Sequence, residues 1–341
     1  MTKRSTAWTV LAGALVGALA FGGIAAAQAP ATPAADQLKT VRLTPRVVPV
    51  GKWPEGMAWD GTSLWVAESG VQRIARIDPA AGKVVETIRV GRLPVDMVGG
   101  ANGAIYAMVN TEQHVFVKTP GNKGAVLTGI AGCPDKMIAH ESLLLALTWP
   151  DCSSGTSKIV AIDPGNGAKR ESGDLGRNGF GIAAAAGRAW LARGTGKIDM
   201  VDLASLKPAG SVDAGGFLST LAGAGSIVFA GGGEADGGGG PPRVARLDAA
   251  TGTATHRATL PGHGHVRALA VTGPHLIAAD GKGTLFVLAA ADLKLLAQLV
   301  IDGPVPLDAR RLLVVGDRLF VSSFVGDGDH NVVMILEGWR P

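Results

Sequence analysis

Histidine and carboxylate side chains gather in two short stretches in the C-terminal third of the sequence. The first stretch reads PGHGHVR, residues 261–267, and the second reads VGDGDHN, residues 325–331. Imidazole nitrogens and carboxylate oxygens are the groups that bind zinc and other divalent metals. The stretches therefore predict a candidate site for Mg, Ca or Zn, with the ligands His263, His265, Asp327, Asp329 and His330. The alternative interpretation is a pair of polar loops that bind no metal.

These stretches belong to a repeated pattern that must position them. Apolar tetrads close on a turn residue at Asp78, Lys118, Asp163, Asp202, Asp248, Ala289 and Glu337. The average spacing of about 43 residues is typical of four-stranded propeller blades. Asp in the recurring Asp-x-x-x-Gly pattern holds a tight turn through its own backbone. We therefore expect these Asp residues to be structural.

The other half of the repeat recurs in step with the first. LWVA at 64–67 matches IYAM, LLLA, AWLA, IVFA, LIAA and LFVS further along the chain, which makes seven copies. The seventh copy lacks an outer strand, which residues 41–51 can supply, closing the ring without an exposed edge. The sequence thus predicts an all-β fold for residues 41–340: a seven-bladed β-propeller of four-stranded blades, with the N-terminal strand completing the last blade.

The N-terminal residues predict export. Lys3 and Arg4 precede an apolar run from about residue 7 to residue 24, and three alanines follow at 25–27. This is the layout of a cleaved signal peptide, residues 1–27. An uncleaved anchor helix is the alternative. Residues 28–40 form a Pro/Ala-rich linker. We expect a periplasmic or secreted protein with no membrane span after signal cleavage.

Cysteine content and charge narrow the classes of partner. Cys133 opens the inner strand of blade three, and Cys152 follows the second strand of the same blade. The two can therefore form a disulfide in an exported protein. Reactive thiols are the alternative. Without Lys3 and Arg4 the chain carries 30 basic and 28 acidic residues (32 minus 2 against 28), a net charge of +2. This balance does not favour binding to nucleic acid.

Two stretches carry a resemblance to known families. LPVDM and RIDPAAGKVVETIRVGRLP resemble the YVTN/YncE-type propellers, which are exported seven-bladed proteins. PEGMAWDGTSLWVAE resembles the repeat of the streptogramin B (virginiamycin B) lyase family. The lyase resemblance implies a His that opens an inner strand, a Glu that closes the next strand, and a magnesium ion nearby.

This sequence departs from that lyase pattern. Blade one holds Glu55 and Glu68 at the two positions, and blade six holds Arg267 and Asp280. His265 lies two residues before Arg267, so a catalytic pair of His265 and Asp280 is out of register.

Loops that enter the inner strands and loops that leave the second strands share one face of a propeller, and ligands usually bind there. The repeat places the following candidate ligand-rim residues on this face: Glu55, Glu68, Asp96, Asp135, Arg267 and Arg310. Glu68 closes a strand, where its carboxylate would either face water or contact a ligand.

Three functions are consistent with these observations. The first is a non-catalytic, exported scaffold that binds a protein or small-molecule partner through this face and needs no cofactor. The second is a metal-dependent enzyme, lyase-like or lactonase-like, that uses His265 and Asp280. The third is an accessory subunit of a periplasmic quinoprotein-type oxidoreductase, because quinoprotein amine dehydrogenases use similar seven-bladed chains. We favour the first, since no blade supplies an in-register acid/base pair.

Overall fold

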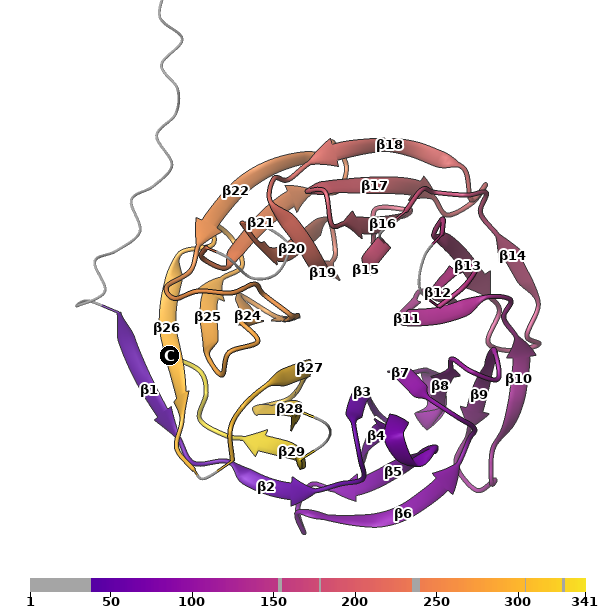
Figure 1. Ribbon diagram of the computed structural model, residues 1–341, viewed down its shortest axis with the longest axis horizontal. Helices are drawn as coiled ribbons and strands as arrows, with labels where there is room; N and C mark the ends of the chain where they lie inside the picture. The colour runs from indigo at the N-terminus through magenta and orange to yellow at the C-terminus, as the bar shows by residue number, and fades with distance from the viewer. Residues whose placement is uncertain (1–37, 153–154, 178, 235–239, 304, 327–328) are drawn as a thin grey trace, which may run out of the picture. The chain divides into compact units, whose positions relative to one another are not determined.

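The structure is a computed structural model that describes residues 38–341, apart from 153–154, 178, 235–239, 304 and 327–328. In these residues, seven sheets stand side by side around a central axis, as Figure 1 shows. The predicted seven-bladed β-propeller is therefore confirmed. The predicted signal peptide at 1–27 and nearly all of the predicted linker at 28–40 lie outside the described residues.

Each blade runs from an inner strand beside the axis to an outer strand at the rim. Blades one to three consist of β3 (Pro54–Trp59), β4 (Leu64–Glu68), β5 (Arg73–Asp78) and β6 (Lys83–Arg89); β7 (Pro94–Gly99), β8 (Ile105–Val109), β9 (His114–Lys118) and β10 (Ala125–Gly129); and β11 (Cys133–His140), β12 (Leu143–Trp149), β13 (Lys158–Ile162) and β14 (Lys169–Glu171). Two 3-10 turns, η2 (Ser69–Val71) and η3 (Ala101–Gly103), join strands of the first two blades.

The remaining four blades follow the same order. They consist of β15 (Gly179–Ala185), β16 (Arg188–Arg193), β17 (Lys197–Asp202) and β18 (Pro208–Asp213); β19 (Phe217–Ala224), β20 (Ile227–Gly233), β21 (Arg243–Asp248) and β22 (Thr253–Thr259); β23 (Ala268–Thr272), β24 (His275–Ala279), β25 (Leu285–Ala289) and β26 (Leu295–Ile301); and β27 (Ala309–Val315), β28 (Arg318–Val325) and β29 (Asp329–Leu336).

The N-terminal segment closes the ring, but it does so with two strands. Strand β2 (Arg46–Pro49) pairs antiparallel with β29 and completes blade seven, as predicted. Strand β1 (Lys39–Leu43) instead pairs parallel with β26 and becomes a fifth strand of blade six. Pro45 separates the two strands, and proline has no N–H to donate to a sheet. The single strand expected over residues 41–51 is thus divided between two blades.

Neighbouring blades pack face to face, which explains the nearly continuous apolar runs of the sequence. All five residues of β4 are buried, so this strand has no solvent face. Trp65 and Ile74 of blade one lie in the same apolar cluster as Met97 and Ile105 of blade two. Each second strand is therefore covered on both sides, and its sequence lacks the alternation of a half-exposed strand.

The repeated Asp residues hold turns, as the sequence predicts. Asp78 Oδ1 accepts the backbone N–H groups of Ala80 and Ala81 at 2.8 and 3.0 Å. Asp248 makes the equivalent pair of bonds in blade five. Hydrogen bonds from the Ala81 and Ala80 amides lower the pKa of Asp78, because they favour its charged form.

Cys133 and Cys152 form the predicted disulfide, with their Cα atoms 5.1 Å apart. The bridge closes the loop between the start of β11 and the residues that follow β12, and it contributes about 3 kcal/mol to stability in the chain-entropy picture. Of the helices in the described part of the chain, none has the length and apolar character needed to cross a membrane.

Candidate functional site

A bulge at the start of the inner strands shapes one end of the central channel. In six blades the pairing of the inner strand with the second strand shifts by a residue or more near its beginning. A bulge re-aims side chains, so successive residues can approach the same side of a strand. Accordingly, the consecutive pairs Phe180 and Gly181, Ser219 and Thr220, and Arg310 and Arg311 all line the channel. We call this end of the channel, where the inner strands begin, the channel mouth.

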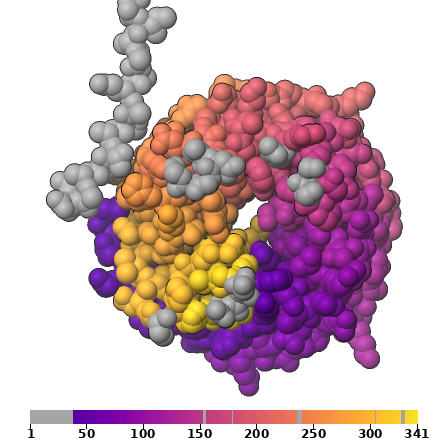
Figure 2. All heavy atoms as spheres, viewed as in Figure 1, coloured from indigo at the N-terminus to yellow at the C-terminus, as the bar shows by residue number. Residues whose placement is uncertain are grey.

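The channel is a cavity of about 520 Å³ on the axis of the ring, visible as the central opening in Figure 2. Its charged lining is strongly asymmetric among the described residues. Four cationic side chains border the cavity, namely Lys136, Arg267, Arg310 and Arg311. Asp96 is the one carboxylate that borders it among these residues.

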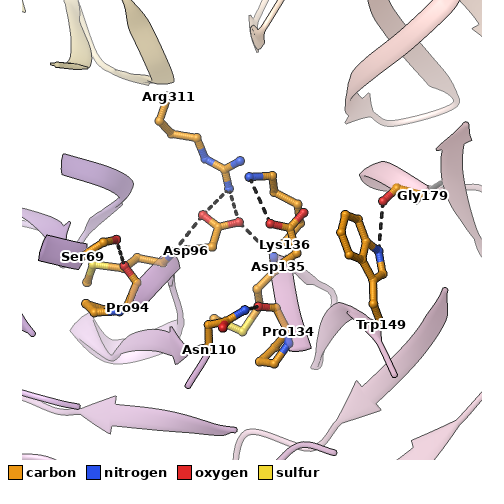
Figure 3. Close-up of polar contacts among 12 residues, drawn as sticks. Ser69, Pro94, Asp96, Asn110, Pro134, Asp135, Lys136, Trp149, Gly179 and Arg311 are labelled. Carbon is orange, nitrogen blue, oxygen red and sulfur yellow. Dashed lines mark hydrogen bonds and ion pairs between the residues drawn. The ribbon is translucent and has the colours of Figure 1, made fainter. Parts of the chain in front are cut away.

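Asp96 is a fully engaged carboxylate at the junction of three blades (Figure 3). Its side chain is 1% exposed. It accepts the N–H of Met97 and the N–H of Met137 in the next blade, both at 2.9 Å. Arg311 reaches it from blade seven, with contacts of 2.7 and 2.8 Å to the two carboxylate oxygens. With four contacts, Asp96 has little capacity left for a ligand and instead fixes the position of Arg311.

Asp308 is shared by two guanidinium groups at the channel mouth. Arg267 of blade six contacts Asp308 Oδ1 at 3.3 Å, and Arg310 of blade seven contacts Oδ2 at 2.9 Å. The Arg310 guanidinium also lies over the ring of Phe324, with its central carbon 4.0 Å from the ring centroid. Two cations share one carboxylate, so this group carries a surplus positive charge beside the cavity.

Glu55 and Lys136 complete the charged side of the channel mouth. Partial burial raises the pKa of Glu55 above its ordinary value of 4.5, against the opposing effect of Lys136 and Arg310. The neighbouring Asp135 raises the pKa of Lys136, and burial opposes this shift. The Lys136 ammonium lies 3.9 Å from Asp135. Lys136 therefore stays charged at neutral pH, whereas Glu55 holds its proton more readily than an ordinary glutamate.

Aromatic rings lie at the channel mouth on blades three to six, a range that includes the blades of Lys136 and Arg267. Trp149 meets Phe180 edge-on at 6.2 Å between centroids, and Phe180 lies 5.5 Å from Phe217. The ring of His265 lies 6.0 Å from Phe217. Gly194 makes room for two of these rings, because a Cβ at this position would lie 2.8 Å from Phe180 and 3.0 Å from Phe217. We call Trp149, Phe180, Phe217 and His265 the aromatic arc.

Hydrogen bonds between neighbouring blades hold the channel mouth in place. Side chains of one blade donate to backbone carbonyls at the start of the next inner strand (Figure 3). Ser69 donates to Pro94 at 2.5 Å, Asn110 to Pro134 at 2.8 Å, and Trp149 to Gly179 at 3.2 Å. Ser322 donates to Glu55 across the closing blade at 2.9 Å. The inner strands are thereby tied together at their first residues.

Glu68 closes the second strand of blade one, as the repeat predicts, but it is buried and does not belong to the ligand rim. Its side chain has no exposed surface, and it pairs with Arg73. It also accepts the N–H of Gly51 at 2.7 Å. Glu68 therefore anchors the segment that follows β2 to blade one, and it neither faces water nor borders the cavity. The expectation that a strand-closing carboxylate is solvated fails because the N-terminal segment covers it.

Asp280 and His265, the residues of the enzymatic alternative, make contacts that hold the structure together. Asp280 is 4% exposed, and its Oδ1 accepts the N–H groups of Lys282 and Thr284 at 2.7 and 2.9 Å. This arrangement holds the turn between β24 and β25. His265 contributes its ring to the aromatic arc.

The predicted metal ligands are only partly described. Asp327 and the side chain of Asp329 lie outside the described part of the structure, while His263 and His330 are exposed. Among the side chains that are described, no group of three or more His, Cys, Asp or Glu could hold a metal ion.

The structure brings Glu55, Asp96, Asp135, Arg267 and Arg310 to the channel mouth and adds residues that the sequence did not single out. Arg311, Phe180 and Phe217 belong to this group. The sequence held part of the signal for Arg311. An extra residue at the start of the inner strand of blade seven marks a bulge, and this bulge directs both Arg310 and Arg311 toward the cavity.

The fold and the channel together define the class: a closed seven-bladed β-propeller with a charged channel. Hydrazine synthase from Kuenenia stuttgartiensis is similar over 86% of this chain and 98% of its own, with a TM-score of 0.66 and 14% identity. The computationally designed Ika8 protein is similar over 85% of this chain and 98% of its own, with a TM-score of 0.57 and 13% identity. Likeness at these identities shows the fold alone. Neither a protein-family model nor a curated protein matches the sequence.

Proposed function

We propose that this protein is an exported, non-catalytic β-propeller that binds a small molecule at the channel mouth. The observation that carries the proposal is the lining of the channel, which presents four cationic side chains to a cavity of about 520 Å³. Cavities of about 300–1,000 Å³ with a few convergent polar groups are typical of small-molecule sites.

The charges favour a small molecule over a protein partner. Arg267, Arg310 and Arg311 border an internal cavity instead of spreading over an outer surface. The bonds between blades keep the first residues of the inner strands in register, so the site is largely preformed. A preformed site binds a ligand with a lower ordering cost than a flexible surface does.

The proposal of export rests on the leader and the disulfide. Lys3 and Arg4 before the apolar run have the pattern of a signal peptide. The bridge between Cys133 and Cys152 fits an oxidising compartment.

A screen of small molecules by ligand-observed NMR tests the proposal. The wild-type chain is compared with a Lys136→Met/Arg310→Met double variant. Arg318→Met serves as the control, because it removes a cation from the exposed Arg318–Glu337 pair instead. We expect compounds that bind the wild-type chain and the Arg318→Met control but lose affinity about tenfold or more for the double variant. The proposal is contradicted if no compound binds, or if the compounds bind the folded double variant equally well.

A further inference from the structure

Among the described residues of the channel mouth, one group carries a net positive charge that a monoanion would neutralise. Arg267 and Arg310 share the single carboxylate of Asp308, so this triad has a net positive charge. Asp96 and Arg311 neutralise each other, and Lys136 lies beside Asp135. Glu55 lies near these cations, and its burial raises its pKa against the effect of Lys136 and Arg310. A cationic cavity without a full countercharge favours an anionic ligand.

On the opposite side of the cavity, the described lining residues carry no charge. Blades four and five contribute Phe180, Gly181, Ile182, Ser219, Thr220 and Leu221 to the lining. Ser219 donates its hydroxyl to the Val266 carbonyl at 2.5 Å, so this donor is already used. Phe180 is half-buried and keeps part of its ring toward the cavity, with Phe217 packed beside it. Offset or edge-on contact with a third ring is favourable at such a pair.

We infer that the ligand of the channel mouth is a small aromatic carboxylate. Its carboxylate lies among Arg267, Arg310 and Lys136, and its ring packs against Phe180, which Phe217 supports. The inference rests on the proposed function, because it assigns a chemical class to the ligand of that same site. Guanidinium groups bind carboxylates through paired N–H donors. A dianion would exceed the single net charge of the Arg267, Arg310 and Asp308 group, so an aromatic carboxylate fits better than an aromatic phosphate.

Isothermal titration with matched probes tests the inference. Benzoate and 1-naphthoate carry both features, benzamide and 1-naphthamide lack the charge, acetate lacks the ring, and phenyl phosphate carries a higher charge. We expect at least one of the two carboxylates to bind, with its amide about tenfold weaker or more. Acetate and phenyl phosphate should also bind more weakly than that carboxylate.

Three variants assign the contacts. Arg310→Met leaves Asp308 paired with Arg267, and Lys136→Met leaves a half-exposed Asp135, so neither strands a buried charge. Each should weaken the carboxylate about tenfold and leave the amide unchanged. Phe180→Leu should weaken the carboxylate and the amide together. Arg318→Met is the matched control and should bind like the wild-type chain.

Several results would overturn the inference. These are equal affinity for carboxylate and amide, equal affinity for acetate and benzoate, tighter binding of phenyl phosphate, or binding that survives both cation variants. Failure of both carboxylates to bind would also overturn it. If the NMR screen meanwhile finds neutral or non-aromatic ligands that depend on Lys136 and Arg310, the inference fails and the proposed function stands.

Discussion

Glu55 is the carboxyl group of the channel mouth whose pKa is raised by its surroundings. It occupies the start of β3, at the same bulged position as Arg310 in blade seven and Phe180 in blade four. Burial raises its pKa, and the cations Lys136 and Arg310 only partly offset this effect. The same two cations that oppose this effect border the cavity, where an external anion could also reach them.

The raised pKa of Glu55 makes stability depend on pH in a defined direction. Below the ordinary pKa of 4.5 the folded and unfolded chains both hold the proton. As the pH rises, the unfolded chain releases its proton first, so the free energy of unfolding falls until the pH passes the raised folded pKa. Above that point Glu55 is ionised in both states, and its buried charge lowers the free energy of unfolding by a constant amount.

Glu55→Gln should remove this pH-dependent cost. Without ligand, the difference in Tm between variant and wild type should grow by about 1–3 °C in favour of the variant between pH 4 and pH 8. Thermal unfolding at a series of pH values measures it. Glu141→Gln is the control, because the Glu141 side chain is 81% exposed. A Tm difference that stays constant with pH, or falls, would show that burial does not set the protonation of Glu55.

At the scale of the element, the inner strands need close backbone approach to place the bulged residues. Gly56 of β3 lies directly against β7. A Cβ at Gly56 would lie 2.4 Å from the Met97 nitrogen and 2.6 Å from the Asp96 Cα. Both contacts are with backbone, which cannot turn aside as a flexible side chain can. Gly56 therefore sets the spacing of blades one and two, and with it the position of Asp96.

Gly56→Ala should lower the free energy of unfolding by about 2–3 kcal/mol, because the added methyl group overpacks two inner strands. Urea denaturation measures the loss. Gly173→Ala is the matched control, since a Cβ there meets no atom within 4 Å, and it should change stability by less than about 0.5 kcal/mol. Equal stability of the two variants would mean that the inner strands can separate without cost.

The strands themselves could be predicted from the sequence, but their partners across the ring could not. The repeat revealed the blades, the turn role of Asp78 and the bridge of Cys133 with Cys152, because each depends on residues within one blade. Arg311 and Asp96 lie 215 positions apart and meet only when the ring closes. Glu68 lies only 17 positions from Gly51, but its burial depends on how the segment after β2 runs across blade one, which the repeat does not show.

At the scale of the whole molecule, closure of the ring converts scattered residues into one cavity. Strands β1 and β2 from the N-terminal segment extend blades six and seven. These two blades contribute Arg267, Arg310 and Arg311 to the cavity. The ion-pair partner of Arg311, Asp96, lies on blade two. Blades four and five contribute the lining residues that, in the described part of the chain, carry no charge. The division of the described lining into a charged part and an uncharged part is therefore a property of the assembled ring.

The methionines of the chain provide a direct test of where a ligand lies. Met57, Met97 and Met137 border the channel beside the bulges, whereas Met200 and Met334 are packed between blades away from it. In a titration of methyl-¹³C-methionine protein with 1-naphthoate, the methyl resonances of Met57, Met97 and Met137 should shift with a common saturation curve, and those of Met200 and Met334 should stay in place. Saturable shifts confined to Met200 and Met334, or no shift at any of the five at millimolar ligand, would contradict a ligand site at the channel mouth.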